Sequence, residues 1–226
     1  MNRRYEELRK EEYERYKRYS PEKMLIMSAV ASFIGWVVEN VWLMMRNGYM
    51  INLNMHFPFL IGYGAAIMGF YYVAGTPDDP GPILKKVRGT SRSRRVTAYY
   101  IFAVIAVSLG EMTIGLVSEK LFGFHYWDYT VLPLHITRYT SIPTSCAFAL
   151  LIFLFMDKAF TPIMEFLDRF SDRSLKIAAA VLTFIMVFDF LSSFRMMSAS
   201  GKRNAVWKIE FKRSSVSGST QIKKII

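Results

Sequence analysis

The sequence predicts an all-α protein, a polytopic bundle of about five transmembrane helices. Hydrophobic residues make up 52% of the 226 residues, a share that by itself is close to that of a soluble protein. Their distribution is more informative, because most charged residues lie in the termini and between long apolar runs. The Lys and Arg residues are also divided unevenly among the intervening segments. Both patterns are typical of a membrane protein.

Five segments have the apolar character of membrane-spanning helices. About 20 mainly apolar residues are needed to cross the hydrocarbon core, with a range of roughly 17–25. The first, third and fifth segments fit this length, whereas the second and fourth are shorter or interrupted. Pro58 and Pro143 lie near the starts of these two, and proline is tolerated in the first turn of a helix. The predicted spans are residues 24–45, 57–73, 96–117, 142–160 and 175–194.

Three regions follow from this pattern: a charged segment at 1–20, the transmembrane bundle at 21–195 and a basic tail at 196–226. In the first region Glu and Lys or Arg recur at helical spacing, which predicts a helix in water or on the membrane surface. Its end combines an N-capping residue, a proline at the first helical position and an acid in the first turn, Ser20, Pro21 and Glu22. We therefore expect the first span to start there.

The distribution of Lys and Arg predicts a cytoplasmic N-terminus. On alternating sides of five spans, the N-terminal segment with the 74–95 and 157–176 loops holds 18 of the 29 basic residues, and the 46–56 and 118–141 loops hold 3. Cytoplasmic loops carry such an excess. The tail from Arg195 holds 8 more, and five spans place it outside, against the rule. Early helices usually dominate orientation, so we keep the cytoplasmic N-terminus despite the tail. We expect five spans in the cell membrane.

The chain also contains a weak internal repeat. The segment IGWVVENVW at 34–42 resembles IGLVSEKLF at 114–122, and each is followed by a polar, aromatic loop and a span with a proline near its start. A duplicated two-helix unit, with both copies in the same orientation, would explain the likeness. Chance similarity between apolar helices is the alternative.

Carboxylates inside the spans are the strongest candidates for function. Glu39, Glu111 and Asp189 each lie 14 or 15 positions into a predicted span. At 1.5 Å per residue this places each about 21–22 Å into a core of about 30 Å, so all three share one depth. A charge at such a depth is costly and normally faces the bundle interior or water. Glu119 lies two turns beyond Glu111 on the same face.

Other polar and aromatic residues lie in the outer loops or at the start of the second span, near that level. A polar cavity open to the outside is the functional interpretation. The structural alternative is that the acids only hydrogen-bond neighbouring Tyr, Asn and Trp residues and so hold the bundle together. The candidate residues for the cavity are Glu39, Asn52, Tyr63, Glu111, Glu119, Trp127, Asp128, Tyr129 and Asp189.

Several other kinds of chemistry have little support in the sequence. The single cysteine, Cys146, cannot form a disulfide framework, and no HExxH or comparable spacing indicates a metal site. We expect no cofactor. The chain contains no GxxxxGK[ST] motif and so cannot itself be an ABC-type ATPase. The basic run at 85–95 and the net charge of +11 are explained by membrane topology and anionic lipid, not by nucleic acid.

Two blocks of sequence carry a family resemblance: FIGWVVENVW at 33–42, and GEMTIGLVSEKLFGFHYWDY at 110–129. With Asn52, Pro58 and the pair Tyr63-Gly64, they resemble the ABC-transporter type IV (CmpB-like) integral membrane proteins over roughly residues 30–155. The chain departs from the family pattern at Phe57, where a glycine is expected. The resemblance implies a polytopic membrane protein whose functional candidates are Glu39, Glu111, Glu119, Trp127, Asp128 and Tyr129, and a separate ATPase or other membrane subunit as its partner.

Three functions are consistent with these observations. The leading hypothesis is a permease-like or transporter-like subunit that lies in the lipid bilayer and binds a small polar or amphiphilic ligand in an outward-facing cavity. The second is a membrane-embedded enzyme acting on a lipid-linked substrate, with Glu39 and Glu111 as acid and base. The third is a structural or regulatory membrane subunit.

Overall fold

The computed structural model describes residues 19–123, 125, 127–201, 206–211 and 222–223. Four helical segments are long and apolar enough to cross a membrane, and a fifth, shorter apolar helix lies between the first two of them. The predicted all-α bundle of about five spans is therefore confirmed. The long segments are Pro21–Asn47, Arg92–Leu121, Ile142–Leu167 and Asp172–Ser200, and the shorter helix is Ile61–Ala74. The helix predicted within residues 1–20 lies almost wholly outside the described residues.

Helix α2 (Pro21–Asn47) starts where the capping residues predicted it would. The Ser20 side chain accepts a hydrogen bond from the backbone N–H of Lys23, Pro21 takes the first helical position, and Glu22 lies in the first turn. The helix ends at Gly48, whose φ of 72° is a conformation that favours glycine. We call the two ends of the bundle the Ser20 end and the Gly48 end.

The fourth span is longer than predicted and is not a regular α-helix throughout. Helix α5 (Ile142–Leu154) continues through a π-helical turn, η2 (Phe155–Ala159), into α6 (Phe160–Leu167). Pro143 lies in its first turn as expected. Pro58, by contrast, does not start a helix, because α3 (Ile61–Ala74) begins three residues later. The backbone before Pro58 is held by hydrogen bonds to α7, which are described below.

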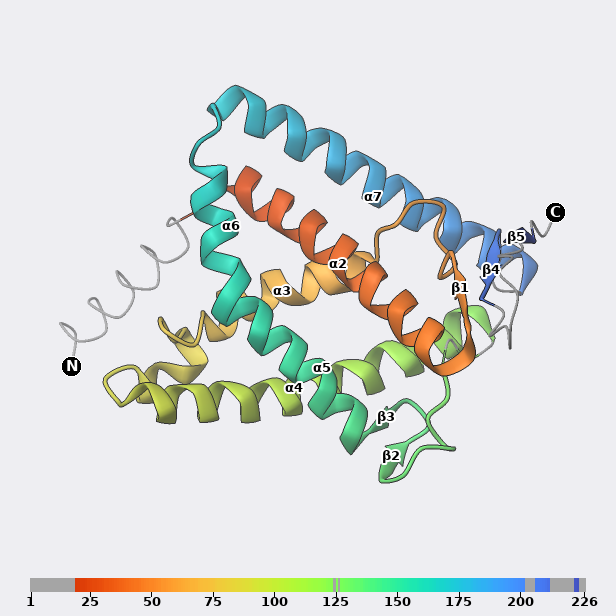
Figure 1. The fold of residues 1–226 in the computed structure, drawn as a ribbon, viewed down its shortest axis with the longest axis horizontal. Coiled ribbons are helices and arrows are strands. Elements are labelled where there is room, and N and C mark those ends of the chain that lie inside the picture. Colours follow the sequence, from red (N-terminus) through yellow and green to blue (C-terminus); the bar gives the residue numbers. More distant parts are fainter. Residues whose placement is uncertain (1–18, 124, 126, 202–205, 212–221, 224–226) are drawn as a thin grey trace, which may run out of the picture.

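Helix α2 lies at the centre of the fold (Figure 1). It packs against α3 and α7 (Asp172–Ser200), whereas α4 (Arg92–Phe122) packs mainly against α5. The buried core lies toward the Ser20 end, where methionines from α2, η2 and α6 belong to one buried cluster with three aromatic residues. Tyr71 and Phe160 stack there with ring centroids 4.8 Å apart. These side chains fix the mutual positions of the helices that carry the candidate acids.

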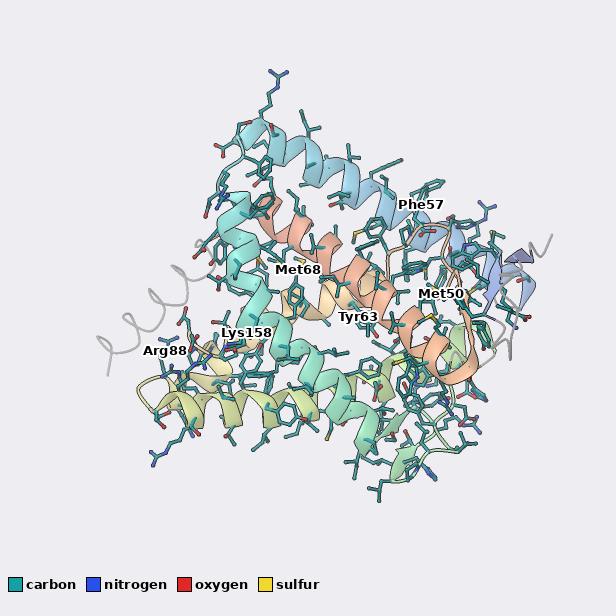
Figure 2. The ribbon with its side chains drawn as sticks, in the orientation of Figure 1. Met50, Phe57, Tyr63, Met68, Arg88 and Lys158 are labelled. Atoms are coloured by element: carbon teal, nitrogen blue, oxygen red, sulfur yellow. The ribbon has the colours of Figure 1, made fainter. Side chains whose placement is uncertain are left out.

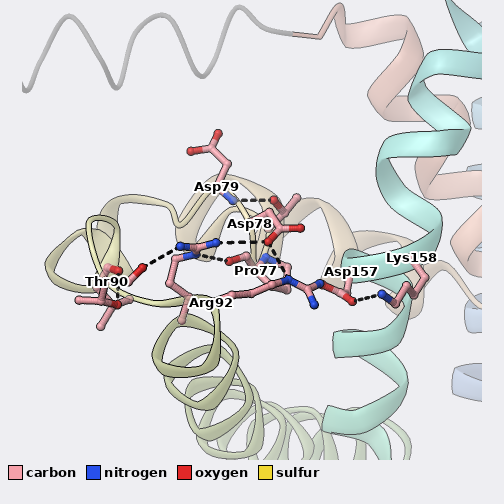
Figure 3. A network of polar contacts seen from close by, with 10 residues as sticks. Pro77, Asp78, Asp79, Thr90, Arg92, Asp157 and Lys158 are labelled. Atoms are coloured by element: carbon pink, nitrogen blue, oxygen red, sulfur yellow. Dashed lines mark hydrogen bonds and ion pairs between the residues drawn. The ribbon is translucent and has the colours of Figure 1, made fainter.

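The Ser20 end is closed by an ordered loop and a network of ion pairs (Figure 3). This loop follows α3 and continues through the 3₁₀ helix η1 (Pro82–Val87) into α4. Arg92 bridges two carboxylates, with Nε 3.1 Å from Asp78 Oδ1 and Nη2 2.8 Å from Asp157 Oδ1. Hydrogen bonds from Arg92 and Arg95 lower the pKa of Asp78. Asp157 lies in the π-helical turn and is only 3% exposed, so Arg92 joins the loop to the fourth span.

At the Gly48 end the chain after α7 returns to the first loop. Strand β1 (Tyr49–Ile51) pairs antiparallel with β4 (Lys208–Glu210), which in turn pairs with β5 (Ile222–Lys223). The Val206 N–H donates to Asn52 Oδ1 at 3.2 Å, and the rings of Trp36 and Trp207 are 6.2 Å apart. The described part of the tail therefore lies on the same side of the bundle as the 48–60 loop. An odd number of crossings produces this arrangement.

Candidate functional site

Glu39 lies on α2 beside a tyrosine that enters from α3. The Tyr63 hydroxyl donates a hydrogen bond to Glu39 Oε1 at 2.5 Å, and its ring packs edge-on against Phe148 of α5. In Figure 2 Tyr63 lies between the helices of the bundle. Gly35, one turn before Glu39, makes this possible, because a Cβ there would lie 2.3 Å from the Tyr63 ring. The glycine therefore serves the close approach expected of small residues at helix interfaces.

Glu111 on α4 is bound by hydroxyl groups from the start of the fourth span. Thr140 Oγ1 donates to Glu111 Oε2 at 2.8 Å, and Ser145 Oγ donates to the same oxygen at 3.2 Å. Both hydroxyl residues are fully buried. Thr140 belongs to β3 (Thr140–Ser141) and Ser145 to the first turn of α5, so the segment that leads into α5 positions the Glu111 carboxylate.

Tyr129 brings the two acids into one cluster. It lies in the loop after α4, is half-buried, and forms a hydrogen bond with Glu111. Burial, and then the charges of Glu111 and Glu39, raise the pKa of the Tyr129 hydroxyl. Both carboxylates therefore lie within electrostatic range of the same phenol. We call Glu39, Tyr63, Glu111 and Tyr129 the acid–tyrosine cluster. Arg46 is close enough to act on Tyr129 in the opposite sense.

Glu119 repeats the arrangement of Glu39 on the other half of the fold. The Tyr139 hydroxyl donates to Glu119 Oε2, and a Cβ on Gly115 would lie 2.3 Å from the Tyr139 ring. In both halves a glycine one turn before a glutamate admits a tyrosine that binds the glutamate. The weak repeat seen in the sequence thus coincides with a repeated three-residue contact. Glu119 also pairs with His125 at 3.2 Å and with Arg138 at 3.6 Å, and its side chain is partly exposed.

Trp127 and Asp128 have local contacts in the loop after α4. Trp127 Nε1 donates to the backbone oxygen of Tyr139 at 2.8 Å, which ties the loop to the segment before α5. Asp128 Oδ1 accepts hydrogen bonds from the backbone N–H and the hydroxyl of Thr130, at 2.8 and 2.7 Å. These bonds lower the pKa of the exposed Asp128. Both residues shape the loop that carries Tyr129.

Asp189 lies in a separate cluster, away from the acid–tyrosine cluster. Its carboxylate is 1% exposed and accepts hydrogen bonds from the backbone N–H groups of His56 (2.8 Å) and Phe57 (2.9 Å). His56 Nδ1 lies 3.0 Å from Asp189 Oδ1, and the Ser193 hydroxyl lies 3.4 Å from it. This carboxylate holds the 55–58 loop on α7. Asn52 anchors the same loop, donating to the Met55 carbonyl at 2.9 Å.

Comparison with known protein families shows that residues 26–194 match the family described as Putative ABC-transporter type IV. The chain belongs to this family. The match reaches from α2 to α7, beyond the 30–155 region that carried the resemblance in the sequence, and confirms that resemblance. No curated protein and no solved structure matched the chain.

This member of the type IV family is a multi-pass membrane protein with two groups of contacts that sequence reasoning did not find. Thr140 and Tyr139 bind Glu111 and Glu119, but nothing in their spacing from α4 indicated it. Ser193, one turn after Asp189 on α7, could have been found from helical periodicity.

Among the described residues, no group of three or more His, Cys, Asp or Glu side chains is arranged to hold a metal ion.

Proposed function

We propose that the chain is the permease-like membrane subunit of a transport system, and that its acid–tyrosine cluster binds a small polar or amphiphilic ligand. Membership in the type IV family and the apolar helices support a membrane role. The observation that carries the proposal is the convergence of two half-buried carboxylates, from α2 and α4, on Tyr129. Within the described residues, neither carboxylate forms an ion pair with Lys or Arg.

The chemistry of the cluster favours a ligand that donates hydrogen bonds or carries positive charge. The Tyr63 hydroxyl donates its hydrogen bond to Glu39 Oε1, and the Thr140 hydroxyl donates its hydrogen bond to Glu111 Oε2. In the described part of the chain no side chain donates to Glu39 Oε2, which leaves that oxygen as an acceptor. A carboxylate charge that is partly buried inside a helix bundle is costly unless a neighbouring group compensates it. An ammonium or hydroxyl group of a ligand would provide that compensation.

The orientation proposed for this subunit puts the Ser20 end in the cytoplasm. The 74–95 loop and the network around Arg92 lie there, on the side that carries the larger number of basic residues. A separate ATPase would then contact the protein from the Ser20 end, since the chain has no nucleotide-binding motif of its own. The acid–tyrosine cluster and the 123–141 loop would face the outside.

The orientation can be tested with single cysteines at Ser91 and Thr130 in a Cys146→Ser background. We expect an impermeant thiol reagent applied to intact cells to label Thr130→Cys and to label Ser91→Cys only after permeabilisation. Ser91 directly precedes α4 at the Ser20 end, and Thr130 is exposed in the loop after α4. Labelling of Ser91→Cys alone in intact cells would reverse the proposed topology.

The ligand site can be tested with Glu39→Gln and Glu111→Gln, because glutamine keeps the shape of the side chain and removes its charge. We expect the double variant to insert and fold, with its melting temperature in detergent nearly unchanged. Small molecules released from the purified protein by denaturation and quantified by mass spectrometry should fall at least about tenfold, the effect of losing roughly 1.4 kcal/mol of binding free energy.

Glu165→Gln is the matched control for this experiment. Glu165 is an exposed glutamate on α6, far in sequence from the cluster, and its substitution should change neither stability nor bound ligand. A double variant that loses stability and retains its bound small molecules in proportion to the folded fraction would contradict ligand binding. It would support a structural role for the two acids instead.

A further inference from the structure

The hairpin before α5 exposes an uncharged, apolar surface. It consists of β2 (His135–Thr137) and β3 (Thr140–Ser141), with residues 129–134 leading into it. From residue 129 to residue 137 the sequence contains no Asp, Glu, Lys or Arg. Val131, Leu134 and Ile136 are 77%, 66% and 58% exposed. Val131 and Leu134 lie in the segment that leads into β2, and Ile136 lies on β2. We call these three side chains together the hairpin tip.

The hairpin tip is continuous with the lipid-facing surface of the fourth span. The Ile142 N–H at the start of α5 donates to the Leu134 carbonyl at 3.1 Å, and Ile142 itself is 47% exposed. Further along the same span Leu150 and Leu154 are also exposed. In Figure 1 the hairpin lies beside the start of α5, at the edge of the bundle away from α7. Lipid that covers the exposed side of α5 would therefore meet the tip.

The residues around the tip fit the boundary between lipid and water. Trp127 precedes it, and tryptophan side chains favour the level of the lipid headgroups. The charged residues that flank the uncharged segment, Asp128 and Arg138, are both exposed and can remain in water. Apolar side chains bordered by polar ones in this way are typical of segments that lie in a membrane interface.

The backbone of the hairpin presents a large apolar side chain at a position where one is disfavoured. Leu134 has a φ of 55°, in the left-handed region that glycine and asparagine adopt most easily. A leucine there carries a conformational cost that its exposed side chain does not recover in water. Burial in lipid would recover it.

We propose that the hairpin tip inserts into the lipid leaflet next to the Gly48 end and acts as an interfacial anchor. The occupant of this surface is the acyl-chain and glycerol region of the bilayer. Insertion fixes the height of the segment that carries Tyr139 and Thr140, which bind Glu119 and Glu111. The anchor is independent of the identity of any transported ligand.

The experiment places an environment-sensitive fluorophore on single cysteines at Leu134 and Ile136, in the Cys146→Ser chain reconstituted into phosphatidylcholine and phosphatidylglycerol vesicles. Lys120, exposed in the last turn of α4, is the control position. We expect lipids with a spin label near the headgroup to quench the two hairpin probes at least about threefold more than the Lys120 probe. Iodide in the water should show the opposite order.

Two results would overturn the proposal. The first is iodide quenching at both hairpin positions equal to that at Lys120, which would place the tip in water. The second is protection from iodide that rises with the protein-to-lipid ratio without quenching by spin-labelled lipid, which would assign the surface to a second copy of the chain. The use of two hairpin positions keeps the test valid if one variant fails to fold.

Discussion

Replacing Asp189 with alanine should lower the free energy of unfolding in detergent by about 3–5 kcal/mol. The carboxylate is almost completely buried and accepts hydrogen bonds from two backbone N–H groups, besides its contacts with His56 and Ser193. Alanine would leave both N–H groups without their acceptor and release the 55–58 loop from α7. Thermal or denaturant unfolding of the purified variant measures the effect.

Asp128→Ala is the appropriate control for this substitution. Asp128 also accepts two hydrogen bonds, but both come from Thr130 and the carboxylate is exposed to water, so its loss should cost less than about 1 kcal/mol. A loss of stability no larger for Asp189→Ala than for Asp128→Ala would refute the anchoring role. Asp189 would then return to the candidates for ligand binding.

Replacing Gly64 with alanine should destabilise the protein by about 3 kcal/mol, the upper range for overpacking. A Cβ at this position would lie 2.3 Å from the carbonyl oxygen of Ser28 and 2.5 Å from the Ser32 hydroxyl. The first of these atoms is backbone, so α2 and α3 would have to separate to admit a methyl group. Because Tyr63 is the preceding residue, its hydrogen bond to Glu39 should weaken as well.

Gly69→Ala in the same helix provides the matched control. A Cβ at Gly69 would meet no atom within 4 Å. Alanine also has the higher helix propensity, so this variant should be as stable as the parent or more stable by up to about 1 kcal/mol. Equal melting temperatures for the two alanine variants would show that α2 and α3 are not held together by close contact at Gly64.

The sequence by itself was sufficient to predict the number and approximate limits of the helices. Apolar length is a local property, and so are the capping signals at Ser20 and Pro143, both of which the structure bears out. Pro58 shows where local signals fail, because the backbone before it is fixed by Asp189, more than 130 residues away. A contact of that kind leaves no trace in the neighbouring sequence.

The sequence also predicts a common depth for the three acids, which stays a prediction, but it does not predict the neighbours of each acid. Counting residues placed Glu39, Glu111 and Asp189 at one level, since every helical residue adds the same rise. Which helix each side chain faces depends on the rotation and packing of its own helix. The depth of the residue does not determine either. The structure pairs α7 with α2, so that Asp189 meets His56, whereas Tyr129 joins Glu39 and Glu111.

The end of the bundle at which the described part of the basic tail lies was likewise decided only by tertiary structure. Charge counting gave two contradictory indications, because it treats each loop alone. Backbone pairing of Tyr49–Ile51 with Lys208–Glu210 places the described part of the tail at the Gly48 end, through hydrogen bonds between segments about 160 residues apart. Composition and spacing thus determined that the chain forms helices long and apolar enough to cross a membrane. Long-range packing decided which acids meet, because the partners of a side chain are chosen by folded geometry and not by its position along the chain.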